Sequence, residues 1–294
     1  MTTIISAAQV KELRERTGAG MMECKKALET SSGDMERAIE ELRKSGITKA
    51  GKKAGRIAAE GAIAINENGK QAVMIEINSE TDFVARDSNF TAFVQTVVAT
   101  ALQVQIHDVN QLSAHTLQNT SKTIEETRQE LVAKVGENVQ IRRLVLSNPT
   151  AVCVGTYVHG NRIGVIVELD VDNKELARDI AMHIAASRPL VISPDNVSQD
   201  LIAKEKEIYM AQAATSGKPQ EIIEKMVAGR LKKYLDEVSL MGQPFVKNPD
   251  VTVGSLLNKQ RAKVLAFYRY EVGEGIEKVA EDFKEAVMSQ VQGG

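Results

Sequence analysis

The chain carries one strand pattern twice, first as AIAINENGKQAVMIEI at residues 62–77 and again as VCVGTYVHGNRIGVIVEL at residues 152–169. In each copy, two apolar runs of strand length flank a turn signal, which is Asn68-Gly69 in the first and His159-Gly160-Asn161 in the second. Short apolar runs around such a turn are typical of a β-hairpin. The repeat therefore predicts two related hairpins within one duplicated core.

Each copy continues into a helix and a later third strand. Apolar residues recur at helical spacing over residues 90–102 and 176–184, and apolar strand patterns follow at 139–146 and 264–272. The fold class predicted is α+β, with two small three-stranded antiparallel sheets covered by helices.

Alternation along a strand also predicts which side chains share a face. In the third strand of the first copy, these are Val139, Ile141, Arg143 and Val145. We expect all of them on one side of the sheet.

The first 46 residues show three short helical patterns. The first ends at TGAG (residues 17–20), the second stops at SSG (31–33), and Asp34 is placed as the N-cap of the third. So small a bundle has few large apolar side chains, and we expect it to bury its remaining surface on something else.

A basic segment at residues 43–56 has no acid between Glu41 and Glu60. Its three glycines favour a linker over a helix. Its cations could instead follow an RNA backbone, but no aromatic residue occurs before position 83 to stack on bases. The charged linker is the favoured interpretation, and no direct nucleic-acid contact is expected.

Two helical patterns at residues 192–240, separated by Ser216-Gly217, interrupt the second copy. They predict a helical hairpin with an apolar stripe on both legs, which packs on another copy, on a partner or on its own domain. The predicted division of the chain is an N-terminal three-helix domain and linker (1–55), a first core subdomain (56–148), a second core subdomain (149–191 with 241–276), the hairpin (192–240) and a C-terminal helical module (277–294).

Composition argues against several classes of protein. Of 294 residues, 43% are apolar and 26% are charged, with 37 basic against 39 acidic side chains, as in a globular soluble chain. No apolar run approaches the ~20 residues of a membrane span, and no signal sequence is visible, so we expect a cytoplasmic protein without membrane contact. Histidines and cysteines occur singly, so no catalytic group, metal site or cofactor is expected.

The segment SETDFVARD (residues 79–87) is unusual because it places Phe83 among polar neighbours between a strand and a helix. Such a phenylalanine is either folded back as a helix staple or exposed as an interaction wedge. The residues alone favour the staple.

Several long motifs resemble those of one family, bacterial translation elongation factor Ts. VKELRERTGAGMMECKKAL (10–28) resembles its N-terminal signature, and TDFVA (81–85) resembles its second signature. Three more stretches are similar to family motifs: MHIAAS (182–187), GQPFV (242–246) and EVGEGIEK (271–278).

The resemblance implies a guanine-nucleotide exchange factor for elongation factor Tu, without catalytic chemistry of its own. Such a factor binds Tu-GDP, disrupts the magnesium site, releases GDP and stabilises the nucleotide-free form until GTP binds. The implied layout is a ubiquitin-associated-like three-helix domain, two related core subdomains, a coiled-coil hairpin and a C-terminal helical module.

The resemblance also assigns residues, and it reverses the preference on Phe83 from staple to wedge. The implied magnesium-dislocating loop consists of Thr81, Asp82, Phe83 and Val84. The implied contacts with elongation factor Tu are Leu13, Arg14, Met21, Met22, His159 and Val246. The hairpin is the candidate for a homodimer or a 2:2 complex.

Two other functions stay open at this point. One is an RNA-binding translation protein that uses residues 43–56. The other is a scaffold that binds elongation factor Tu without accelerating nucleotide exchange.

Overall fold

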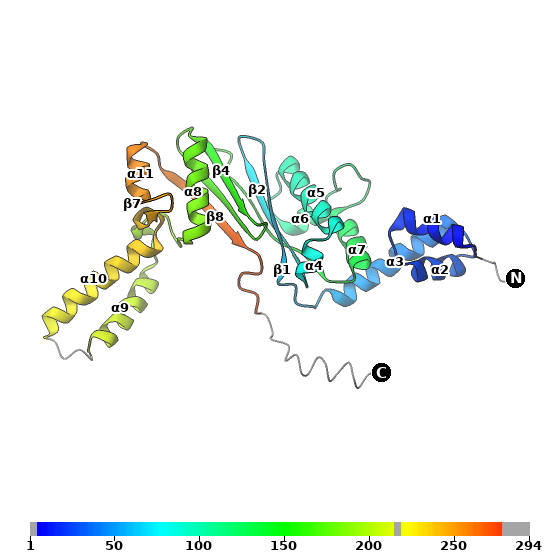
Figure 1. Cartoon of the computed structure of the whole chain (residues 1–294), viewed down its shortest axis with the longest axis horizontal. Coiled ribbons are helices and arrows are strands. Elements are labelled where there is room, and N and C mark those ends of the chain that lie inside the picture. The colour runs from blue at the N-terminus through cyan, green and yellow to red at the C-terminus, as the bar shows by residue number, and fades with distance from the viewer. Residues whose placement is uncertain (1–4, 215–218, 278–294) are drawn as a thin grey trace.

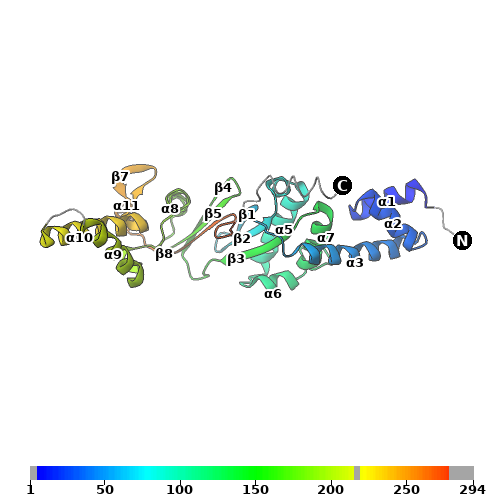
Figure 2. The same cartoon turned by 90° about the horizontal axis from the view of Figure 1, so that it is seen from below.

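The computed structural model describes residues 5–214 and 219–277. The molecule is elongated, with a three-helix bundle at one end, a helical hairpin at the other and the strands between them (Figures 1 and 2). The C-terminal helix predicted within 277–294 lies outside the described residues, apart from Glu277.

The N-terminal bundle forms as the sequence predicts over its first two helices. Its elements are α1 (Ala7–Thr17), α2 (Met21–Thr30) and α3 (Met35–Lys53). Ser6 and Gln9 form a capping box at the start of α1, and Gly18 ends that helix at a φ of 68°, where glycine carries no steric penalty. Leu13 and Leu28 are fully buried in the bundle core.

The third helix does not stop at Gly46 but continues to Lys53, so the prediction of a linker is wrong over residues 43–53. The reason is tertiary. A Cβ atom placed on Gly46 would lie 3.5 Å from the Cβ atom of Ala133 in α7 (Ile124–Val135). Gly46 therefore lies where α3 packs on α7, and this packing outweighs the low helix propensity of glycine.

The core confirms the predicted α+β duplication. The first antiparallel sheet has the order β1-β2-β3, made by β1 (Glu60–Glu67), β2 (Ala72–Ser79) and β3 (Val139–Leu146). The second has the order β4-β5-β8, made by β4 (Cys153–His159), β5 (Ile163–Leu169) and β8 (Val264–Glu271).

Helices and a small extra hairpin complete the two units. Those of the first unit are α4 (Asp82–Ala85), α5 (Ser88–Val104), α6 (Val109–Ala114) and α7. Those of the second unit are α8 (Lys174–Ser187), α11 (Val253–Lys259) and the two-stranded sheet of β6 (Pro244–Phe245) and β7 (Asn248–Thr252). The inserted hairpin consists of α9 (Gln199–Ala214) and α10 (Gln220–Val238). The helices α6, α7 and α11 and the β6–β7 hairpin are additions to the predicted pattern.

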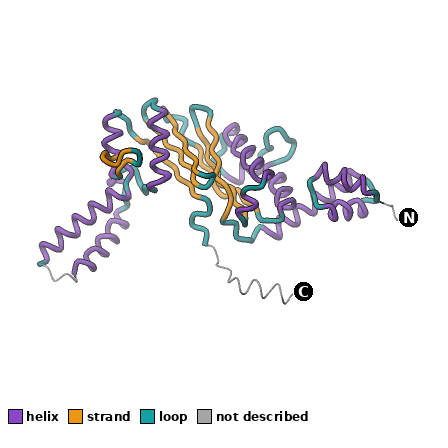
Figure 3. Tube along the Cα trace, in the orientation of Figure 1, coloured by secondary structure: helices purple, strands orange, loops and turns teal. Residues whose placement is uncertain are grey.

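The helices cover the outer face of each sheet, and the inner faces of the two sheets pack against each other (Figure 3). The inner layer includes Ile63 and Met74 from the first sheet and Ile166 from the second. The sheets approach closely at Gly164, where an added Cβ atom would lie 2.5 Å from the Ile63 side chain. Each unit thus has an outer core of its own, and the two share an inner one.

The side chains expected on one face of β3 do not share it. The pairing of β3 with β2 shifts between Ile141 and Arg143, which makes Arg142 an extra residue, as in a β-bulge. Ile141 packs with the helices, whereas Val145 packs between the sheets. The bulge reverses the alternation partway along the strand.

Candidate partner-binding site

The segment after β2 presents an aromatic side chain to solvent. Thr81 caps α4, because its Oγ1 atom accepts a hydrogen bond from the Val84 backbone N–H at 3.3 Å. Val84 is buried in the first core, whereas Phe83 is 82% exposed. Phe83 is therefore not folded back as a staple.

This exposure does not come from a loose loop. The Glu137 carboxylate accepts hydrogen bonds from the Thr81 backbone N–H at 3.0 Å and from the Thr81 hydroxyl at 2.7 Å. One residue earlier, the Glu80 carboxylate accepts from the Asn138 backbone N–H at 2.6 Å. The connection between α7 and β3 thus holds the start of α4 at two points.

Asp82 lies at the surface beside Phe83. Its carboxylate forms an ion pair with Arg86 at 2.7 Å, and both side chains are substantially exposed. An exposed pair within one turn of helix contributes little to stability, so Asp82 can exchange this partner for another.

The turn between α1 and α2 faces the same side of the molecule as α4. An open groove runs between them, lined by Arg14, residues 18–20 and Phe83. Met21 and Met22, which follow that turn directly, are 58% and 74% exposed. The structure therefore brings together residues from the first two motifs, which lie more than fifty positions apart in sequence.

Leu13 does not lie on this surface. Its side chain is fully buried against Cys24 and Leu28 in the bundle, so it has no area to offer a partner. It stabilises the helix that carries Arg14.

The two predicted contact residues of the second unit lie at turns. His159 ends β4, where its ring stacks on Tyr157 with centroids 6.3 Å apart. Val246 is 43% exposed in the turn between β6 and β7. Their neighbours Tyr157 and Lys247 line one groove between β4 and α8.

His183 is buried and hydrogen-bonded through both ring nitrogens. Its Nδ1 atom accepts a hydrogen bond from the Val246 backbone N–H at 3.2 Å, and its Nε2–H donates to Gln243 at 2.9 Å. Burial lowers the pKa of His183, which agrees with a neutral ring. The motifs that contain His183 and Val246 give no sign that His183 holds the Val246 turn.

Five of the six cations in the basic segment have partners within the chain. Arg43 pairs with Glu126, Lys49 with Glu23 and Arg56 with Glu80, Lys44 lies next to Glu40 and Glu41, and Lys53 donates to the Gly136 carbonyl. The neighbouring acids lower the positive potential that a phosphate backbone would meet, which counts against an RNA-binding role.

Across residues 5–214 and 219–277, no group of three or more His, Cys, Asp or Glu side chains is arranged to hold a metal ion. In those same ranges, no helix has both the length and the hydrophobicity to cross a bilayer. Cys24 and Cys153 are buried free thiols, and burial raises the pKa of Cys153.

Comparison with known proteins agrees with the motifs. Residues 80–274 match the family described as Elongation factor TS. The chain is 59% identical to elongation factor Ts of Thioalkalivibrio sulfidiphilus, over 98% of this chain and 99% of that protein. Identity is 56% to the protein of the same name from Legionella pneumophila and 53% to that from Francisella tularensis, with the same coverage. The chain therefore belongs to the elongation factor Ts family and acts in translation elongation.

Proposed function

We propose that this protein is a guanine-nucleotide exchange factor for elongation factor Tu in the cytoplasm, with no catalytic chemistry or cofactor of its own. The observation that carries the proposal is Phe83, an exposed aromatic side chain on a helical turn that Glu137 and Asn138 hold in place. A large exposed apolar group on rigid backbone is typical of an interaction hot spot.

Exchange requires differential binding rather than acid–base chemistry. A protein that binds the nucleotide-free GTPase more tightly than the loaded form weakens nucleotide binding by the same factor. A thousandfold acceleration of release corresponds to about 4 kcal/mol of barrier lowering. One buried aromatic side chain with a few polar contacts can supply this amount.

Phe83 acts as the wedge in this mechanism. It enters the partner near the elements that support its magnesium ion, which bridges the phosphates of bound nucleotide. Asp82 leaves its ion pair with Arg86 and accepts hydrogen bonds from donors that the displaced elements release. Thr81 and Val84 keep the turn in shape, one as the cap and the other as the buried anchor.

Two further surfaces hold the partner. Arg14, Met21 and Met22 contact it beside Phe83, and the turns with His159 and Val246 contact it from the second unit. The hairpin of α9 and α10 buries Ile223 and Val227 between its legs but leaves Ile208 and Ile222 partly exposed, and these carry a homodimer or a 2:2 complex.

The test is stopped-flow release of fluorescent GDP from elongation factor Tu, with and without this protein. We expect release to accelerate on the order of a thousandfold at saturation. Binding without acceleration would instead identify a scaffold. Absence of binding to Tu, together with a salt-sensitive shift of RNA in a gel, would favour the RNA-binding alternative.

A further inference from the structure

A buried carboxylate lies between the two sheets. Glu76 is in the central strand of the first sheet, on the inner face it shares with Ala72 and Met74, and is fully buried. Because Ala72 and Met74 on this face are apolar, the pattern predicts an apolar side chain at position 76. A buried charge persists at such a position only where several partners satisfy it.

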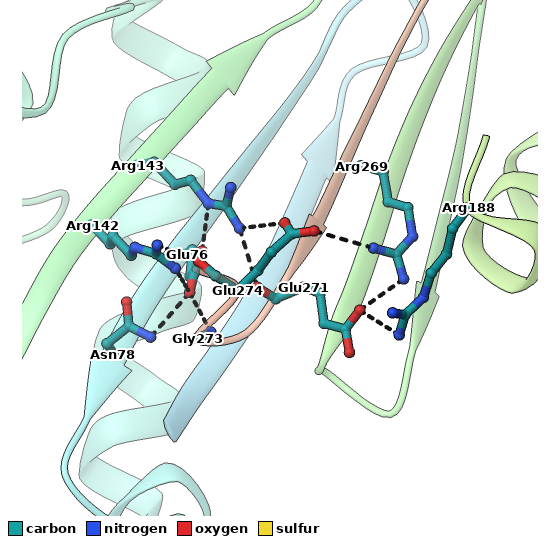
Figure 4. Close-up of polar contacts among 9 residues, drawn as sticks. All are labelled: Glu76, Asn78, Arg142, Arg143, Arg188, Arg269, Glu271, Gly273 and Glu274. Carbon is teal, nitrogen blue, oxygen red and sulfur yellow. Dashed lines mark hydrogen bonds and ion pairs between the residues drawn. The ribbon is translucent and has the colours of Figure 1, made fainter. Parts of the chain in front are cut away.

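Glu76 has four hydrogen-bond partners, and one comes from the second unit (Figure 4). Arg142 donates at 3.0 Å, Arg143 at 2.5 Å and Asn78 at 3.0 Å, all from the first sheet. The Gly273 backbone N–H, just after β8 of the second sheet, donates at 2.8 Å. Burial alone would raise the pKa of Glu76, but these hydrogen bonds outweigh it and hold the pKa below its usual range.

The two arginines extend the network further into the segment after β8. Arg143 donates to the Glu271 carbonyl at 3.1 Å and lies 3.3 Å from the Glu274 carboxylate, and its guanidinium stacks 4.0 Å from the Tyr270 ring centre. Arg142 donates to the Glu274 carbonyl. A cluster of directional bonds therefore ties the first sheet to residues 270–274.

The ends of this network lead to both proposed contact surfaces. Glu76 lies in β2, and the chain runs from the end of β2 into α4, which carries Phe83. On the other side, Val272, next to Gly273, donates its backbone N–H to the Arg162 carbonyl at 2.9 Å, in the turn that contains His159. Glu76 thus lies between Phe83 and His159 along an unbroken series of backbone and hydrogen bonds.

The apolar part of the same interface has six buried and five partly buried members. Its six buried members are Ile63, Ala72, Met74, Val154, Ile166 and Val272. Apolar contact is non-directional, so it permits sliding that hydrogen bonds of fixed geometry do not. The directional bonds at Glu76 are therefore suited to setting how one sheet lies on the other.

We propose that Glu76 is a positioning residue that fixes the spacing between the Phe83 turn and the His159 turn, so that both meet the partner at once. This inference rests on the proposed exchange function. It assigns no contact with elongation factor Tu to Glu76 itself.

The chain offers a matched control. Glu168 occupies the equivalent place in β5, also beside a shift in strand register, and is 3% exposed. Its carboxylate accepts from the Asn148 backbone N–H at 2.7 Å, at the end of the first unit, and the amide oxygen of a glutamine can accept the same hydrogen bond. Glu168→Gln therefore perturbs a buried glutamate without loosening the tie between β2 and residues 270–274.

The experiment measures spacing and exchange on the same variants. Spin labels on Gln95→Cys in α5 and Asn258→Cys in α11, both exposed positions, report the distance between the units. We expect one narrow distance peak in the parent protein and a broadened peak after Glu76→Gln. In GDP release, Glu76→Gln should raise the half-saturating concentration about tenfold, because binding must now order the two units, and leave the maximal rate nearly unchanged.

Arg142→Gln is the milder second variant, because it leaves Glu76 paired with Arg143 and Gly273. It should give a smaller change in the same direction, and Glu168→Gln should match the parent in both measurements. An unbroadened peak for folded Glu76→Gln, or an equal loss in Glu168→Gln, would overturn the proposal. If the parent protein fails to accelerate release, the proposed function falls, and the distance peak alone then decides whether Glu76 fixes the two sheets.

Discussion

Replacing Phe83 by alanine should separate exchange activity from folding. The side chain is 82% exposed, so the free protein loses almost no packing. We expect the free energy of unfolding to change by less than about 0.5 kcal/mol, as for surface substitutions in general. The cost should appear only in the complex, where the ring is buried.

The size of that cost follows from the exposure. Full burial of a phenylalanine side chain contributes about 1.5 to 3 kcal/mol. Because 82% of it remains to be buried on binding, its loss should cost about 1.2 to 2.5 kcal/mol, or about 8- to 60-fold in the rate of GDP release.

The assay is stopped-flow GDP release at saturating exchange factor, with thermal unfolding measured on the same samples. Leu190→Ala is the control, because Leu190 is 62% exposed but belongs to neither proposed contact surface. It should leave release unchanged. The wedge mechanism is refuted if Phe83→Ala retains the parent maximal rate, or if its loss of activity parallels a loss of stability.

Other substitutions test the supporting structure. Because burial lowers the pKa of His183, the stability it contributes is present above about pH 6.5 and falls with decreasing pH, by at most about 1.4 kcal/mol per pH unit. Denaturation at a series of pH values should therefore show a flatter dependence of stability on pH for His183→Gln. Parallel profiles for the parent and the variant would contradict this. Gly46→Ala has room for its methyl group against α7 and should raise the free energy of unfolding by about 0.5 to 1 kcal/mol, whereas a lower melting temperature would mean that the helices cannot accept it. Glu137→Ala removes both hydrogen bonds to Thr81 and should lower the maximal rate of GDP release more than Glu130→Ala does. Equal effects would argue against the hydrogen bonds of Glu137 as the support of α4. Ile222→Asp should dissociate a dimer formed through the hairpin in sedimentation velocity, and an unchanged coefficient would confine that stripe to packing within one chain.

Local patterns were sufficient for most strands of the core. The third strand of the first sheet was predicted at its observed bounds, Val139–Leu146, because apolar runs end where polar turn residues begin. The side of the sheet on which each of its side chains lies was not predictable, because the extra residue at Arg142 is defined only by pairing with β2.

Glycine was the main source of error. Gly46 belongs to the segment that was interpreted as a linker, but it packs beside Ala133, which lies 87 positions further along the chain. Phe83 presents the same difficulty, because its exposure depends on Glu137 and Asn138, and no local pattern distinguishes a wedge from a staple. The motif resemblance favoured an exposed Phe83, as observed, whereas the residues alone favoured one that is folded back.

The unbroken α3 has a consequence for binding strength. At 19 residues, it is about 28 Å long, and its packing on α7 fixes the bundle to the core instead of leaving it on a flexible tether. In the proposed complex, Arg14 and Phe83 are therefore two contacts carried by one rigid body. Once the first contact has formed, the second forms at a high effective concentration, without the entropy loss of a mobile linker. A loosened α3 would lower avidity while every individual contact stayed intact.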